Sequence, residues 1–237
     1  MVNGRDEAGS AVATLDAAVR FGRIEDRSDR ILILAAGPSL SKVDMNRIAT
    51  AKRNGVHVIT VNAAVKACAF ANDWFTLDFD KRTRTIAAGC RSSTRTVVAI
   101  PDDFGTPNAR VPAHRCRPPT RPLYLRRLEG NGPLKAKSGL SNDPGSIHTG
   151  NSAYGALGLA WLMKPSMVGL LGLDGTTYPG WPTNHQPRRL DHLNSIFSTA
   201  LPQLRENSVS VMVGNPESLV NCFPRLSADE LIDWIVS

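Results

Sequence analysis

The chain has 237 residues, of which 42% are hydrophobic and 21% charged, and its formal net charge is +7. This length suits one α/β domain, with or without an insertion, and the composition supplies enough apolar residues for a large core. No uncharged apolar run of about 18 residues occurs, which argues against a membrane-spanning helix. The four cysteines are far apart and form no Cys-x-x-Cys pair, so neither a zinc site nor a disulfide framework is indicated; they are Cys68, Cys90, Cys116 and Cys222.

The first residues, MVNGRDEAGSAVATLDAAVRFG, lack the basic-then-apolar pattern of an export signal. Scattered cysteines are also typical of a reducing compartment. We therefore expect a cytoplasmic protein.

Residues 1–30 form an N-terminal lead-in, with one helix predicted over Ala11–Phe21. Beyond it, short apolar or β-branched runs predict strands, and the longer segments between them predict helices. The predicted strands are Ile31–Ala35, Val56–Val61, Trp74–Leu77, Thr96–Ile100, Met167–Leu173 and Val209–Val213. The predicted helices are Val43–Asn54 (capped by Ser41), Ala63–Phe70, Arg82–Gly89, Gly150–Met163, Arg188–Glu206 and Ala228–Val236 (opened by Ser227).

Strands that alternate with helices favour an α/β fold, a Rossmann-like parallel sheet with helices on both faces. We expect one such domain over residues 31–237. In sheets of this kind, ligands bind beyond the carboxyl ends of the strands. Functional residues should therefore follow the strands directly.

Residues 101–148 are expected to be a Pro/Arg-rich insertion into this domain. Between Phe104 and Asn142 the sequence has eight basic residues, six prolines and a single acid, Glu129. Such a segment favours polyanionic partners, which include nucleic acid, lipid headgroups and phosphorylated ligands. A solvated loop with spare positive charge is the alternative.

Small and polar residues follow the predicted strands. Gly37 leaves the backbone bare after the first strand, which we interpret as room for a ligand phosphate or ribose. Helix starts such as the one after Ser39 also offer amides to an anion. The full candidate set for nucleotide binding is Gly37, Pro38, Ser39, Asn62, Asp78, Thr149, Gly150, Asn151, Ser152 and Asp174. These positions predict a nucleotide cleft, although neither a Gly-Lys-Ser/Thr phosphate loop nor a Gly-x-Gly-x-x-Gly fingerprint follows the first strand.

Four blocks carry a resemblance to known families. They are ILILAAGPSL, VITVNAAVKACAFANDWFTLD, TGNSAYGALGLAWLMKPSMVGLLGLDGTTY and VMVGNPESLVNCFPRLS. In this order they resemble the bacterial sialyltransferases of glycosyltransferase family 42. They also resemble the DUF115 family, which includes motility-associated glycosyltransferase-like proteins and an archaeal 6-hydroxymethylpterin diphosphokinase. The resemblance covers most of residues 31–227 and implies a transferase that uses a nucleotide-activated donor.

The resemblance also implies roles for single residues. Asp174 would lie beside the nucleotide, and Tyr178 would donate a hydrogen bond to the departing phosphate. A histidine would be the general base that deprotonates the acceptor hydroxyl, and His185 and His192 are the candidates. Asn215 would lie in a turn at the edge of the cleft.

Two departures keep other functions open. Ala36 stands where the sialyltransferases have a donor-binding Asn, and the interval between Asp174 and the candidate histidines is short for their lid. Asp78 and Asp80 form an Asp-x-Asp that could hold Mg²⁺ or Mn²⁺, as a metal-dependent diphosphotransferase acting on a hydroxymethyl group would need. The third possibility is a DNA-modifying or DNA-binding protein of a phage, which would act in the host cytoplasm. For the glycosyltransferase-like enzyme, the basic insertion over residues 101–148 favours a polyanionic acceptor, with DNA as one candidate.

Overall fold

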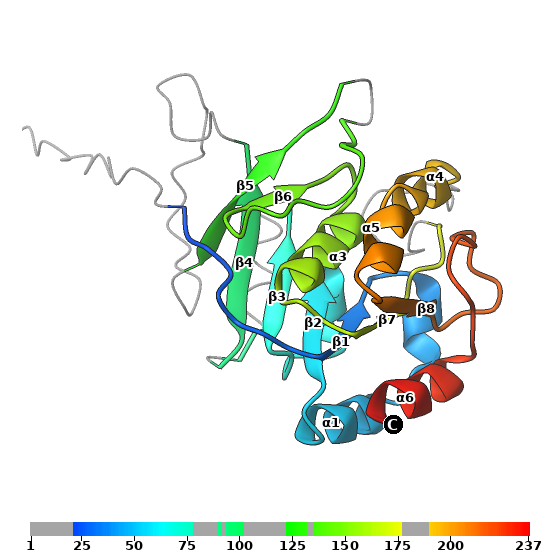
Figure 1. Ribbon diagram of the computed structural model, residues 1–237. Coiled ribbons are helices and arrows are strands. Elements are labelled where there is room, and N and C mark those ends of the chain that lie inside the picture. Colours follow the sequence, from blue (N-terminus) through cyan, green and yellow to red (C-terminus); the bar gives the residue numbers. More distant parts are fainter. Residues whose placement is uncertain (1–20, 78–89, 92, 102–121, 132–134, 177–189) are drawn as a thin grey trace, which may run out of the picture.

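The computed structural model describes residues 21–77, 90–91, 93–101, 122–131, 135–176 and 190–237. Its centre is one eight-stranded sheet of order β6-β5-β4-β3-β2-β1-β7-β8, in which every pair of neighbours is parallel (Figure 1). The strands are β1 Arg30–Leu34, β2 His57–Val61, β3 Asp73–Thr76, β4 Arg95–Ile100, β5 Leu123–Leu128, β6 Ser146–His148, β7 Met167–Leu171 and β8 Ser210–Val213. The Rossmann-like α/β fold predicted from the sequence is thereby confirmed.

Helices cover both faces of this sheet (Figure 1). The described helices are α1 Met45–Arg53, α3 Ser152–Leu162, α4 His192–Ser198, α5 Leu201–Glu206 and α6 Ala228–Val236, with short 3-10 helices η1 over Pro38–Lys42 and η2 over Asn62–Lys66. Helix α3 packs across β1, β2 and β3 on one face, and α6 packs on β1 and β7 on the other, beside α1. None of the helices in the described part of the chain is long and apolar enough to cross a membrane.

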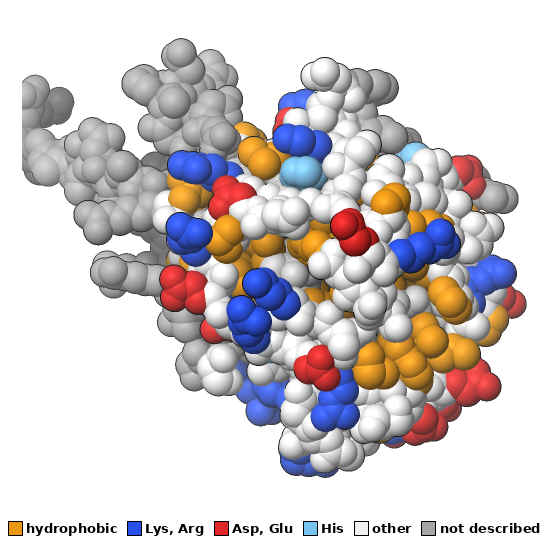
Figure 2. Space-filling view, in the orientation of Figure 1, with side chains coloured by type: hydrophobic (Ala, Val, Ile, Leu, Met, Phe, Trp, Pro, Cys, Tyr) orange, Lys and Arg blue, Asp and Glu red, His pale blue; other side chains and the backbone are white. Residues whose placement is uncertain are grey.

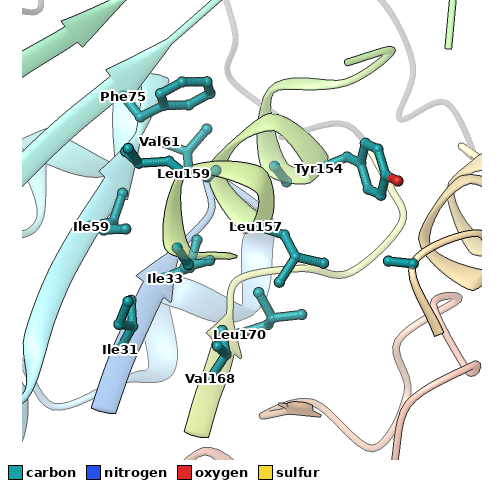
Figure 3. Close-up of a cluster of buried hydrophobic side chains, with 14 of the residues drawn as sticks. Ile31, Ile33, Ile59, Val61, Phe75, Tyr154, Leu157, Leu159, Val168 and Leu170 are labelled. Carbon is teal, nitrogen blue, oxygen red and sulfur yellow. The ribbon is translucent and has the colours of Figure 1, made fainter. Parts of the chain in front are cut away.

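Successive side chains of β1 point to opposite faces of the sheet, so this strand contributes to a hydrophobic cluster on each face. Ile31 and Ile33 pack with α3 and the strands beside β1, as Figure 3 shows, whereas Leu32 and Leu34 pack with the residues of α1 and α6. All four side chains are fully buried. A strand that is apolar on both faces is typical of a parallel sheet covered on both sides.

Helix α3 is buried on nearly its whole circumference, because it crosses the middle of the sheet. Gly155 lets it approach closely, since a Cβ atom there would lie 2.9 Å from Cζ of Phe75. The ring of Tyr154, at the other side of the helix, packs edge-on against that of Phe197, with 5.4 Å between the ring centroids. Its hydroxyl donates a hydrogen bond to Gly139 O at 2.6 Å. The helix therefore has a fixed position, and its N-terminus is fixed with it.

A buried charge network ties the amino ends of β2, β3 and β4 together. Asp73 is 1% exposed; its Oδ2 accepts from Nε2 of His57 (2.7 Å), and its Oδ1 accepts from Nε of Arg95 (2.6 Å). Burial alone would raise the pKa of Asp73, but the hydrogen bonds from His57 and Arg95 outweigh it and hold this pKa below its usual value. Arg95 also pairs with Asp26 of the lead-in, which fastens that segment to the sheet.

Several predicted elements are corrected by the structure. Ser41 does not cap the first helix: it lies in η1, and Asp44 caps α1 by accepting from Asn46 N at 2.8 Å. The single helix predicted over Arg188–Glu206 is two helices in its described part, α4 and α5, and Pro202 lies in the first turn of α5. The break follows from proline, which cannot donate the backbone hydrogen bond that a continuous helix would need.

The predicted helix over Ala63–Phe70 is only the short η2. Residues 101–148, expected as an insertion, supply two strands that the sequence did not reveal, β5 and β6. The predicted helices over Ala11–Phe21 and Arg82–Gly89 fall wholly or almost wholly outside the described residues.

Candidate functional site

The carboxyl ends of all eight strands meet at one edge of the sheet, because the strands are parallel. Strand β1 has β2 on one side and β7 on the other, so the loops that follow β1 and β7 leave in opposite directions. Such a switch in strand order opens a crevice, which is where ligands bind in sheets of this type. The candidate residues Gly37, Ser39 and Asp174 lie in these two loops.

Three residues are joined by hydrogen bonds at this switch in strand order, and we call them the switch-point clasp: Ser39, Asp174 and Asn215. Oδ2 of Asp174 accepts from the backbone N–H of Ser39 at 2.7 Å. Its Oδ1 accepts from the hydroxyl of Ser39 and from Nδ2 of Asn215 at 2.7 Å. Asp174 is only 8% exposed. The clasp therefore joins the ends of β1, β7 and β8 through one buried carboxylate.

Gly37 is required by the protein itself. A Cβ atom at this position would lie 2.3 Å from Gly172 O and 2.6 Å from Oδ2 of Asp174. The N–H of Gly37 also donates to Gly172 O at 2.8 Å. The close approach of the loop after β7 thus accounts for the bare backbone that the sequence analysis assigned to a ligand. Pro38, the next residue, begins η1 in the position where a missing N–H costs nothing.

A second polar cluster lies where β2 and β3 end, and its centre is Asn62. The backbone of Asn62 is left-handed, with φ of 50°. Its Oδ1 accepts from the hydroxyl of Thr76 at 2.8 Å, and its Nδ2 donates to the hydroxyl of Ser152 at 3.2 Å. Asparagine tolerates this conformation better than most residues. The Asn62 cluster therefore connects two strand ends to the start of α3.

Helix α3 begins in the middle of this edge. Oδ1 of Asn151 caps it by accepting from Ala153 N at 2.8 Å. Gly150 fits tightly there, since a Cβ atom would lie 2.4 Å from Cβ of Ala136. Thr149 is 2% exposed, and its buried hydroxyl has no hydrogen-bond partner among the described residues. The first turn of such a helix presents free amides and positive partial charge, which favour an anion.

Basic side chains lie at the same edge, at the end of β5 and in the connection that follows it. Arg127 and Lys135 both pair with Glu129, and Lys135 does so at 2.9 Å. Burial raises the pKa of Glu129, but its hydrogen bonds with Lys135 and Arg127 outweigh this and hold the pKa below the usual value. Figure 2 shows lysine and arginine side chains at the upper end of the view, where the connection from β5 to β6 lies in Figure 1. The rim formed by Arg127, Glu129 and Lys135 therefore carries one net positive charge.

One of the two candidate base residues is described. His192 is half-buried and is the first residue of α4. Leu190 N donates to Gly175 O at 2.7 Å, which starts α4 beside the loop that follows β7. The helix thus begins at the carboxyl edge of the sheet, and His192 with it. The other catalytic candidates, His185 and Tyr178, lie outside the described residues, as do Asp78 and Asp80.

The clasp and the Asn62 cluster bring together Ser39, Asn62, Ser152 and Asp174 in two groups at one edge. The sequence analysis did not identify Thr76 as a site residue. Its position as a polar residue at the end of β3 was nevertheless the same kind of signal as the position of Asn62 after β2. In the described part of the chain, no three His, Cys, Asp or Glu side chains group as metal ligands. Nδ1 of His148, the last residue of β6, lies 3.1 Å from the carbonyl oxygens of both Ser138 and Gly139.

Together these features define a Rossmann-like α/β protein with a polar switch point. The sequence matches no model of a known protein family, and no curated protein matches it either. A solved structure with a similar fold is the MAf glycosyltransferase from Magnetospirillum magneticum AMB-1, with a TM-score of 0.54 and 13% sequence identity. The match covers 88% of this chain but only 35% of that protein. At this identity, the likeness shows the fold alone.

Proposed function

We propose that the chain is a glycosyltransferase-like enzyme, which transfers a group from a nucleotide-activated donor to an acceptor hydroxyl. The observation that carries the proposal is the pair of polar clusters, the clasp and the Asn62 cluster, at the switch point of an all-parallel sheet. Nucleotides bind at this place in many doubly wound folds. The fold shared with a protein named as a glycosyltransferase supports the reaction class.

In this proposal the donor lies across the carboxyl edge. Its diphosphate or phosphate faces Thr149, Gly150, Asn151 and Ser152, where the first amides of α3 and the nearby basic side chains attract negative charge. Its nucleoside faces the loop of Gly37, Pro38 and Ser39. Asn62 holds Ser152 in place and thereby orients the phosphate side of the site.

The transfer needs a base on the acceptor side. The base accepts the proton of the acceptor hydroxyl as the new C–O bond forms at the sugar, and the bond between the sugar and the phosphate oxygen breaks. The phosphate leaves with the bonding electron pair, and Tyr178 donates a hydrogen bond to it. His192 and His185 are the two proposed bases, and the position of His192 at the start of α4 fits this role.

The positive rim favours a polyanionic acceptor, and DNA is one acceptor of this kind. A diphosphotransferase acting on a hydroxymethyl group, with Mg²⁺ or Mn²⁺ held by Asp78 and Asp80, is the alternative that the same cleft would serve. Metal dependence separates the two reactions.

Thermal unfolding with CMP, UMP, GMP, ATP and their sugar conjugates, each with and without Mg²⁺, tests the proposal. We expect at least one nucleotide to raise the melting temperature without metal. Stabilisation by ATP that needs Mg²⁺ would favour the diphosphotransferase, and no shift with any nucleotide would contradict both. With the donor identified, His192→Ala and His185→Ala are compared by turnover: loss in one of them assigns the base, and full activity in both removes the histidine mechanism.

A further inference from the structure

Within the described part of the chain, the donors to the carboxylate of Asp174 leave one of its hydrogen-bonding positions unoccupied. A carboxylate offers about four lone-pair positions. Three donors reach Asp174 from the described residues: the N–H and hydroxyl of Ser39 and Nδ2 of Asn215. All three belong to the clasp, so the protein fixes the orientation of the carboxylate before any ligand arrives. The residue as a whole is 8% exposed.

The charge of Asp174 is held by neutral groups. In the described ranges, no lysine, arginine or histidine lies within ion-pair distance of it, whereas Asp73, Glu129 and Asp229 all have such partners. Hydrogen bonds from amides and hydroxyls stabilise the charge but do not cancel it. Among the described residues, the carboxylate close to the ends of β1 and β7 therefore has no basic partner.

The clasp and the start of α3 consequently differ in the sign of their charge. The clasp repels a phosphate, whereas the start of α3 and the basic side chains near β5 attract one. A carboxylate with a free lone pair accepts a hydrogen bond from a donor group, and a nucleotide carries such donors on its ribose. Every ribonucleotide has these hydroxyls, whereas exocyclic amino groups occur on only some bases.

We propose that Asp174 is a specificity-determining residue that accepts a hydrogen bond from a ribose hydroxyl, so that the site takes ribonucleotides in preference to deoxyribonucleotides. The proposal rests on the proposed function, because it assumes that a nucleotide binds at this edge. It adds an orientation, with ribose at the clasp and phosphate at α3. It also assigns Ser39 and Asn215 as positioning residues, which act on the ligand through Asp174.

The test uses the wild-type chain and the mononucleotide that binds best. Its affinity is compared by calorimetry with those of the 2′-deoxy and 3′-deoxy forms. We expect one of the two to bind at least tenfold more weakly, since a polar group built to meet a hydroxyl is left unpaired by its loss. Equal affinity for all three forms would overturn this proposal while leaving the proposed function in place. If no nucleotide binds at all, both are overturned.

Two further nucleotides test whether the protein group that contacts the ribose hydroxyl is a hydrogen-bond acceptor. In one an amino group, and in the other a fluorine atom, replaces the 2′- or 3′-hydroxyl whose removal weakens binding. The amino group still donates a hydrogen bond, whereas fluorine does not. We expect the amino form to retain affinity within about threefold and the fluoro form to lose at least tenfold, as for the deoxy form. The reverse order would show that a protein donor reads the hydroxyl, and it would overturn the assignment to a carboxylate.

Protein variants then assign the effect to Asp174. In Asp174→Asn the preference for the ribonucleotide should fall to about twofold or less, because a neutral amide replaces the carboxylate. The matched control, Ser152→Ala, changes the phosphate side and should weaken both forms by the same factor. An undiminished preference in a folded Asp174→Asn protein would overturn the proposal. Should this variant fail to fold, the comparison of amino and fluoro nucleotides on the wild type decides.

Discussion

Replacing Gly37 with alanine tests whether the loops after β1 and β7 are locked together as the structure indicates. Glycine is not needed here for its backbone freedom, since its φ of −74° suits any residue. The new methyl group would instead lie 2.3 Å from Gly172 O and 2.6 Å from Oδ2 of Asp174. These contacts are too short to persist, so the loop must shift and pull Ser39 away from Asp174.

The cost has two parts. Overpacking of a tight site costs about 1–3 kcal/mol, and a hydrogen bond to a charged group contributes about 1.5–3 kcal/mol. We therefore expect Gly37→Ala to lower the free energy of unfolding by ~3 kcal/mol or more. For a chain of this length, such a loss lowers the melting temperature by ~6–12 °C.

Urea denaturation followed by circular dichroism measures this change. Gly158→Ala is the matched control, because Gly158 lies inside α3 and its new Cβ atom would meet Cγ2 of Ile147 at the milder distance of 3.2 Å. Its helix propensity gain of up to about 1 kcal/mol offsets that contact. A Gly37→Ala protein as stable as the wild type would refute the proposed locking of the two loops.

Three further predictions concern stability. Asp73→Asn should lower the free energy of unfolding by ~3–5 kcal/mol, because it removes the buried carboxylate that compensates the half-buried His57 and Arg95. Since the pKa of Asp73 is lower in the folded state, its ionised form stabilises the protein above its usual pKa of 3.8, and this contribution is lost as the pH falls through the folded-state pKa. Urea midpoints measured between pH 3 and 7 should therefore fall on acidification less steeply in the variant; parallel curves would contradict this. Asn62→Ala should be less stable than Asn62→Gly by about 1 kcal/mol, because only glycine accepts a φ of 50° without strain, and equal melting temperatures would argue against it. Asp44→Ala should cost ~1 kcal/mol through the lost cap while Ser41→Ala changes little, and thermal melts that show the reverse order would restore Ser41 as the cap.

The buried strands were predictable because their sequences allow little else. The run from Ile31 to Leu34 is apolar at every position, which is typical of a strand covered on both faces. Strand β5 was not predictable in the same way, because its sequence LYLRRL mixes arginine with leucine. It lies toward the edge of the sheet, where only one of its residues, Leu125, is buried, so the local pattern carries no clear alternation.

The candidate site was predictable in position but not in its contacts. The rule that ligands lie beyond strand ends located Ser39, Asn62 and Asp174 at one edge. It could not show that Asp174 bonds Ser39, because these residues are 135 positions apart and meet only through the pairing of β1 with β7. The rule also could not distinguish a glycine that a ligand requires from one that the fold requires. In the structure, Gly37 is required by the fold, because the loop after β7 leaves no room for a Cβ atom.

The proposed function requires that a donor nucleotide binds at the carboxyl edge between β1 and α3. Amide chemical shifts of the ¹⁵N-labelled chain, followed during titration with the nucleotide that most raises the melting temperature, test this binding directly. We expect the largest changes at Ser39, Asn62, Ser152 and Gly175, with little change in the groove between α1 and α6. Changes confined to that groove, or to the amino ends of the strands near Asp73, would contradict it.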